Sequence, residues 1–222
     1  DNDIYATTGG QRFRGVLVRY VDPEAALLYE GFEEFLDPQV WATDGTASII
    51  PDSASSPGNQ CLFMKAEGTL TSSKTSTLQQ LTPVALDAAQ VDIWFRDISL
   101  GSGFTGSALL DLRFYNDTGD PIGHCRQAAG RNLEFAFQDK GTHTAGSNVY
   151  ALEGWHLLSF VYVNGDDSMM SVLLDNVEIL NAIERGAFGT FATMKLQLTG
   201  PWMGVTARGY FDDIAIYDYA ER

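Results

Sequence analysis

The sequence contains few positively charged residues for its length. Lysine and arginine number 14 against 29 aspartates and glutamates, which gives a formal net charge of −15 at pH 7. Proteins that bind nucleic acid or an anionic membrane surface need a positively charged footprint. The deficit therefore argues against nucleic acid as a partner, and it is compatible with neutral ligands and with divalent cations.

Long apolar runs and cysteines are also scarce. No stretch reaches the roughly 18 to 20 consecutive apolar residues of a transmembrane helix, so we expect no insertion into a membrane. The two cysteines, Cys61 and Cys125, allow either one disulfide bond or two buried thiols, and both possibilities stay open. The acidic composition, rich in Ser, Thr and Gly, favours an extracellular location or the surface of a cell or virion.

What the sequence does contain is typical of an all-β protein. It has 22 glycines, 12% aromatic residues and enough hydrophobic residues, 45%, to build a core. Short runs of alternating polarity predict strands, and the segments between them have the composition of turns. The clearest runs are 60–66, 91–98, 108–117, 132–139, 155–163, 168–175, 194–200 and 210–218. Between two of them, Asp175 and Asn176 predict a hairpin turn.

These runs predict one domain over residues 29–222, a two-sheet antiparallel β-sandwich. Residues 1–28 differ from the rest and are interpreted as an N-terminal arm or an extra strand. Within this segment, RGVLVRYV (14–21) alternates like a strand, and DPEAALL (22–28) has the composition of a single helical turn.

The last strand, GYFDDIAIYD (209–218), holds two adjacent aspartates among apolar residues. Strict alternation would place Asp212 on one face of this strand and Asp213 on the other. Whichever face is buried, one carboxylate goes with it. A buried carboxylate needs a hydrogen-bond donor, a cation or a metal ion as its partner.

Stretches at the two ends of the predicted domain together resemble a known pattern. EGFEEF (30–35) and GNQCLFMKAEG (58–68) open the domain, and YFDDIAIYD (210–218) closes it. This arrangement is similar to that of the jelly-roll carbohydrate-binding modules of families 4, 9 and 22. In addition, GWHLLSFVYVNGDDSMMSVLLDNVEI (154–179) resembles the hairpin of laminin-G-like domains, with Asn176 in place of their glycine. The resemblance implies a jelly roll of the concanavalin A-like or galactose-binding-like type.

The same resemblance implies a structural calcium ion. In the carbohydrate-binding families such an ion joins the first and last strands, which corresponds here to Glu33 with Asp212 or Asp213, assisted by Glu34 or Asp37. Ca²⁺ prefers oxygen ligands of this kind. The alternative is that one aspartate accepts backbone hydrogen bonds and that no metal binds.

The faces of the middle strands that point away from the expected core predict a ligand-binding surface. Aromatic rings stack on the apolar faces of sugars, while charged and amide side chains bind their hydroxyl groups. An interface with another subunit and ordinary cross-strand pairing are the alternatives. The residues of the predicted surface are Trp94, Arg96, Asp111, Arg113, Tyr115, Glu134 and Gln138.

Motifs for catalysis are missing from the sequence. The Glu-x-Asp-x-x-Glu strand of retaining glucanases is absent, and so are the signatures of alginate lyases and the nucleophile elbow of hydrolases. The histidines His124, His143 and His156 are scattered, without a partner at metal-ligand spacing. We therefore expect no enzymatic activity, with a glycoside hydrolase or polysaccharide lyase of the same fold as an open alternative.

The sequence thus predicts a non-catalytic, lectin-like module that binds an oligosaccharide or polysaccharide in an extracellular or surface protein. The alternative is a subunit of a surface filament, virion fibre or decoration protein that uses the sandwich as a scaffold. In that case residues 1–28 are expected to bind a protein partner or a second copy of the chain.

Overall fold

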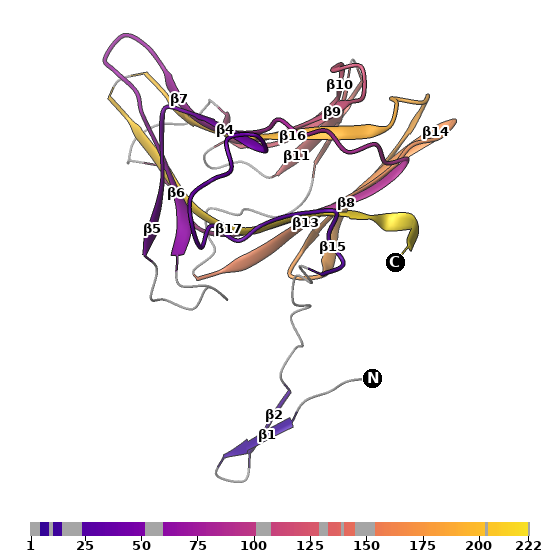
Figure 1. Ribbon diagram of the computed structural model, residues 1–222, viewed down its shortest axis with the longest axis horizontal. Coiled ribbons are helices and arrows are strands. Elements are labelled where there is room, and N and C mark those ends of the chain that lie inside the picture. The colour runs from indigo at the N-terminus through magenta and orange to yellow at the C-terminus, as the bar shows by residue number, and fades with distance from the viewer. Residues whose placement is uncertain are drawn as a thin grey trace.

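The protein is built almost entirely of β-strands, arranged as two antiparallel sheets that face each other (Figure 1). The predicted two-sheet β-sandwich is confirmed. The computed structural model describes residues 5–8, 11–14, 24–51, 60–100, 108–128, 133–138, 140–144, 154–202 and 204–221. In this part of the chain, no helix is long and apolar enough to cross a membrane.

The first sheet has seven strands in the order β12-β11-β10-β9-β16-β7-β4. Its strands are β4 (Trp41–Asp44), β7 (Lys74–Gln80), β9 (Ala108–Asn116), β10 (Pro121–Ala128), β11 (Glu134–Phe137), β12 (Thr142–Thr144) and β16 (Phe191–Gly200).

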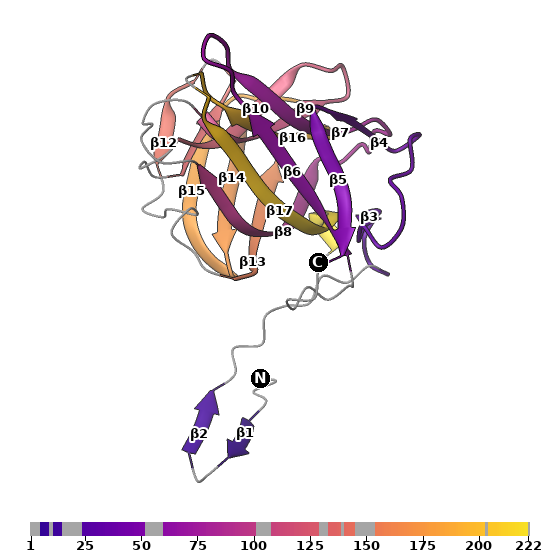
Figure 2. The same cartoon turned by 90° about the vertical axis from the view of Figure 1, so that its left-hand side faces the viewer.

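The second sheet has eight strands, with seven in the order β15-β14-β13-β8-β17-β6-β5 and β3 paired to β17. Figure 2 shows β17 running between β6 and β8. The strands are β3 (Leu28–Glu30), β5 (Thr46–Pro51), β6 (Gln60–Glu67), β8 (Ala88–Leu100), β13 (His156–Val163), β14 (Asp167–Leu174), β15 (Val177–Arg185) and β17 (Thr206–Asp218), which the short 3-10 helix η2 (Tyr219–Glu221) follows.

The core fills the space between the two sheets, and the alternation seen in the sequence builds it. In β9, Leu110, Leu112 and Phe114 are buried and belong to this core. Phe114 meets Phe160 of the opposite sheet with 5.4 Å between ring centroids. Burial of large side chains of this kind is the main source of stability in such a sandwich.

The turn between β14 and β15 is the predicted hairpin. Asp175 and Asn176 both have positive φ values, 50° and 65°. Two successive positive values are characteristic of the type I′ turn, whose twist matches that of the strands it joins.

A β-bulge in β17 overturns the predicted alternation around the two aspartates. Asp212 pairs with Trp94 and Ala215 pairs with Asp92, so β17 has one more residue than β8 between these two pairs. Asp213 takes up the extra residue with a φ of 42°. The extra residue shifts the alternation of side chains by one position, so the residues of β17 that face the core have odd numbers before the bulge and even numbers after it. Phe211 and Ile214 consequently both contribute to the core between the sheets, and neither carboxylate has to.

The first and last strands of the sandwich lie side by side, as the resemblance implies. In β3, Tyr29 pairs with Ala215 and Glu30 pairs with Ile214 of β17. The hydroxyl group of Tyr29 also donates a hydrogen bond to Oδ1 of Asp213. Among the described residues, β3 is the first strand in sequence that pairs with the sandwich, and it starts at Leu28.

The N-terminal segment contains β1 (Tyr5–Thr8) and β2 (Gln11–Arg14), which pair with each other in a separate two-stranded sheet. The strand predicted over 14–21 lies almost wholly outside the described residues. Assembly through residues 1–28 stays a prediction. Cys61 and Cys125 are both buried thiols and do not form a disulfide bond with each other.

We expect Phe114→Ala to lower the free energy of unfolding by about 3–5 kcal/mol, because it leaves a cavity between the sheets. Urea denaturation monitored by circular dichroism measures this change. Leu70→Ala is the control, since Leu70 is 80% exposed and its truncation should change stability by less than about 0.5 kcal/mol. Equal effects of the two substitutions would contradict the assignment of Phe114 to the core.

Candidate functional site

The structure divides the predicted ligand-binding surface between two sheets. Asp111, Arg113 and Tyr115 lie on β9 of the seven-stranded sheet, and Glu134 begins the nearby β11. Gln138 comes directly after β11. Trp94 and Arg96 lie on β8, which belongs to the other sheet. The expectation that all seven residues share one face is therefore wrong for Trp94 and Arg96.

Trp94 and Arg96 take part in packing on the far side of the eight-stranded sheet. Trp94 contacts a small apolar cluster that includes Leu157 and Tyr217. The guanidinium group of Arg96 lies 5.0 Å from the ring centroid of Trp155 and 4.7 Å from that of Tyr210. Cation–π contacts at these distances stabilise the fold.

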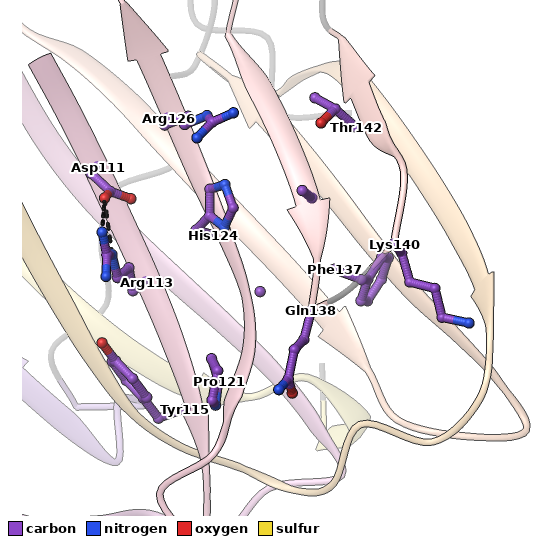
Figure 3. Close-up of a pocket in the computed structure, with 12 residues that line it drawn as sticks. Asp111, Arg113, Tyr115, Pro121, His124, Arg126, Phe137, Gln138, Lys140 and Thr142 are labelled. Carbon is purple, nitrogen blue, oxygen red and sulfur yellow. Dashed lines mark hydrogen bonds and ion pairs between the residues drawn. The ribbon is translucent and has the colours of Figure 1, made fainter. Parts of the chain in front are cut away.

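Four of the other predicted residues line a hollow of about 470 Å³ on the outer face of the seven-stranded sheet, namely Asp111, Arg113, Tyr115 and Gln138. Glu134 is not part of this lining, although it forms an ion pair with Arg126, which is. Figure 3 shows the labelled side chains around the hollow, which come from β9 to β12 and the segments that join them. Gly123 forms part of the floor, where a Cβ atom would lie only 2.6 Å from the carbonyl oxygen of Ala136. The lining residues are Asp111, Arg113, Tyr115, Pro121, Gly123, His124, Arg126, Ala136, Phe137, Gln138, Lys140 and Thr142.

The outer side chains of β9 form an ion pair at the edge of the hollow. Nε and Nη2 of Arg113 both donate to Oδ2 of Asp111, at 2.9 and 2.7 Å. This contact is the main reason why the pKa of Arg113 is raised, and the nearby Tyr115 adds to the shift. Asp111 is buried, and its Oδ1 accepts no hydrogen bond from another described residue. Arg113 is half exposed, so the rest of its guanidinium group faces the hollow.

His124 is the functional candidate that sequence reasoning missed. It lies on β10 directly opposite Arg113, and its side chain is partly buried. Burial lowers the pKa of His124 below its ordinary value of 6.5, and the positive charges of Arg126 and Arg113 lower it further against the opposing effect of Asp111. These influences favour the neutral imidazole, which is the form that can accept a proton.

The sequence contains a signal for His124, but using it requires the pairing register between β9 and β10. The turn-forming segment NDTGD joins the strands at 108–117 and 121–128 as a hairpin. Antiparallel pairing across that turn sets the position opposite Arg113, and the alternation of β10 turns His124 to the outer face while Cys125 faces the core.

The hollow is basic although the protein is acidic. Arg113, Arg126 and Lys140 line it together with one carboxylate, that of Asp111. The net charge of the whole chain is −15. A local excess of positive charge on such a background concentrates anionic ligands at this place on the surface.

The sequence predicts a calcium ion at Glu33, Asp212 and Asp213. Among the described residues, no group of three or more His, Cys, Asp or Glu side chains is arranged to hold a metal ion. Oδ1 of Asp212 accepts the backbone N–H of Asp213 at 2.9 Å, and Oδ1 of Asp213 accepts the Tyr29 hydroxyl. The contact of Asp212 is of the kind that the alternative expects, in which one aspartate accepts backbone hydrogen bonds. The calcium ion stays a prediction.

No protein-family model and no curated protein matches the sequence. Several solved structures match the fold. The endo-β-1,4-glucuronan lyase of the fungus Trichoderma reesei has a TM-score of 0.63 at 12% identity, over 86% of this chain and 95% of the lyase. A glycoside hydrolase family 16 endo-glucanase from Bacteroides ovatus has a TM-score of 0.59 at 12% identity, over 86% of this chain and 99% of the glucanase. A legume lectin-like domain from Entamoeba histolytica has a TM-score of 0.57 at 9% identity, over 85% of this chain and 96% of that domain.

These likenesses confirm the fold as a concanavalin A-like jelly roll. They also correct the expectation that the chain is not an enzyme. A lyase and a glucanase share the architecture, so the fold does not favour a non-catalytic role. The missing motifs exclude particular enzyme families only, because the residues that line the hollow are brought together by strand pairing and not by sequence spacing.

We expect the pKa of His124 to lie below 6.5, and nuclear magnetic resonance titration of the imidazole protons measures it. In Arg113→Gln the pKa should rise, since one of the positive charges that lower it is removed. Arg208→Gln on the eight-stranded sheet is the matched control and should leave the value unchanged. A wild-type value at or above the ordinary one would show that His124 is solvated.

We expect Tyr29→Phe to lower the free energy of unfolding at pH 7 by about 1–3 kcal/mol, because the carboxylate of Asp213 loses its donor. Burial and the neighbouring Glu33 raise the pKa of Asp213. As the pH falls through that pKa the carboxyl group acquires its own proton, so the loss caused by the substitution should shrink. Urea denaturation at several pH values measures both effects.

Thermal unfolding tests the calcium ion. A metal bound only to the native state raises the melting temperature, and the increase grows with the logarithm of the metal concentration once that concentration exceeds the dissociation constant. A higher melting temperature with Ca²⁺ than with EDTA would support the ion at Glu33, Asp212 and Asp213, whereas identical melting curves would remove it.

Proposed function

We propose that this protein is a polysaccharide lyase that cleaves a 4-linked chain of uronic acids by β-elimination in the hollow on the seven-stranded sheet. The observation that carries this proposal is the pairing of Arg113 with a neutral His124 across two neighbouring strands of an otherwise acidic protein. An arginine and a neutral base at adjacent positions are what the elimination of a uronate requires.

Arg113 binds the carboxylate of the sugar in this proposal. Two of its N–H groups are used by Asp111, and a guanidinium group has five, so further donors remain for a ligand. Hydrogen bonds between arginine and a carboxylate are charge-assisted and strong. Neutralising the carboxylate makes the hydrogen on the neighbouring C5 atom more acidic, because the negative charge that develops there is stabilised.

His124 removes the C5 proton, and Tyr115 donates a proton to the leaving glycosidic oxygen. The C5–H bond and the C4–O bond break, and a double bond forms between C4 and C5. The electron pair of the C5–H bond becomes the new double bond, and that of the C4–O bond stays on oxygen, which Tyr115 protonates. No water and no cofactor is consumed, and solvent returns both side chains to their starting states.

Hydrolysis fits the hollow less well than elimination does. The carboxylates of the outer face, Asp111 and Glu134, are held by arginines, with 2.7 Å between Asp111 and Arg113 and 3.5 Å between Glu134 and Arg126. A glycoside hydrolase needs two carboxyl groups that flank the glycosidic bond and act on it directly, and both carboxylates here are engaged by arginine side chains instead.

The similar structures support a function in carbohydrate chemistry, since a glucuronan lyase, an endo-glucanase and a lectin-like domain are among them. The lyase supports the choice of reaction, because it is an endo-β-1,4-glucuronan lyase of the same fold. A polysaccharide outside the cell as substrate would agree with the predicted extracellular or surface location.

The test is an assay of the full chain on polyuronates, followed by the ultraviolet absorbance of the 4,5-unsaturated product. We expect activity in the wild type and a fall of at least about a hundredfold in kcat for His124→Asn, the loss typical of a missing general base. Activity should also fall as the pH drops through the pKa of His124, because the protonated imidazole cannot accept the C5 proton.

Arg208→Gln provides the control for a lost surface charge and should keep full activity. Release of reducing ends without ultraviolet absorbance would identify a hydrolase instead. Absence of product from every polyuronate, or full activity in His124→Asn, would overturn the proposed reaction.

A further inference from the structure

The basic hollow continues as a row of side chains across the sheet. On the outer face, Lys195 of β16 lies opposite Arg113, and Arg113 lies opposite His124. Gln79 of β7 lies opposite Lys195 at the far end. We call Gln79, Lys195, Arg113 and His124 the basic row. It crosses four neighbouring strands and contains no carboxylate.

The neighbouring row on the same face has a different composition. Here Gln197 lies opposite Asp111, Asp111 opposite Arg126, and Arg126 opposite Glu134. Its carboxylates form the ion pairs with Arg113 and Arg126. Within the described part of the chain, no carboxylate forms an ion pair with Lys195.

Lys195 beside Arg113 is therefore a pair of like charges directly opposite each other in a sheet, which destabilises the fold. The cost stands out because acidic residues outnumber basic ones two to one in this chain, 29 to 14. An anionic ligand that crosses the strands would relieve the repulsion by placing negative charge beside Lys195, since Arg113 already pairs with Asp111.

We propose that Lys195 binds the carboxylate of the sugar next to the one held by Arg113, so that the substrate is a polymer with uronic acids at consecutive positions. This inference rests on the proposed function and specifies its substrate class. Neighbouring strands are about 4.8 Å apart, roughly the length that one 1,4-linked sugar adds to a chain. A chain that crosses β10, β9 and β16 thus presents about one sugar to each strand.

The chemistry of lysine suits this second position. Consecutive carboxylates of such a chain point to alternating sides, and the flexible stem of lysine reaches either side. Arginine, with its fixed planar fork, suits the position where the carboxylate must be held in one orientation for elimination. In a copolymer with a uronic acid at every second position, Lys195 would face a neutral sugar.

The test compares binding of two tetrasaccharides, one with four consecutive uronic acids and one that alternates uronic acid with N-acetylhexosamine. Calorimetry on the full chain carrying His124→Asn prevents cleavage. Adding Lys195→Gln should weaken binding of the uronate tetrasaccharide by about tenfold, as expected for the loss of one charge-assisted hydrogen bond. Binding of the alternating tetrasaccharide should change less than twofold. Lys74→Gln, at the exposed start of β7, is the matched control and should change neither.

If Lys195→Gln weakened the binding of both tetrasaccharides equally, the inference would be overturned. Lys195 would then act only through its general positive charge and not by binding one particular carboxylate. Unchanged binding of the uronate tetrasaccharide would overturn the inference as well. A different outcome would contradict the proposed reaction alone. In that case the wild-type protein forms no unsaturated product, while the uronate tetrasaccharide still binds and Lys195→Gln still weakens that binding.

Discussion

The alternation of side chains along β9 is the constraint that connects the core of this protein with its candidate site. Leu110, Leu112 and Phe114 face the other sheet and fix the position of the strand in the sandwich. Asp111 and Arg113 lie between them in sequence and consequently point to the outer face. Any shift of β9 by one residue would bury this ion pair in the apolar core, so the same packing that stabilises the fold holds the site in register.

The sequence predicts this part of the structure well because it depends on local pattern. A strand with apolar residues at every second position reveals its two faces without knowledge of its neighbours. Asp111, Arg113 and Tyr115 were predicted to face away from the core on this basis, and the hairpin at Asp175 and Asn176 was predicted from its turn composition. These features require no information about which strands pair.

The alternation of apolar and polar residues does not reveal which sheet a strand belongs to or where a β-bulge occurs. Trp94 and Arg96 point away from the core as expected, yet they do so on the opposite side of the sandwich. Alternation distinguishes inner from outer faces and gives no sign of the sheet to which a strand belongs. In β17, the one extra residue at Asp213 exchanges the faces, which is a property of the pairing with β8. His124 was missed for a related reason, since its importance arises from the residue opposite it.

The distribution of charge connects these structural observations with the proposed chemistry. Acidic residues prevail over the whole chain, whereas the hollow and the basic row collect arginine, lysine and a neutral histidine on one face. The carboxylates Asp111 and Glu134 pair with Arg113 and Arg126, so Lys195 is the cation of the basic row that no described carboxylate balances. A sheet that keeps two cations opposite each other gives up some folding stability, and stability of this kind is commonly given up where a ligand restores the balance. The net negative charge of the whole chain adds to this contrast, because it would repel polyanions in general while the positive side chains at the hollow attract them locally.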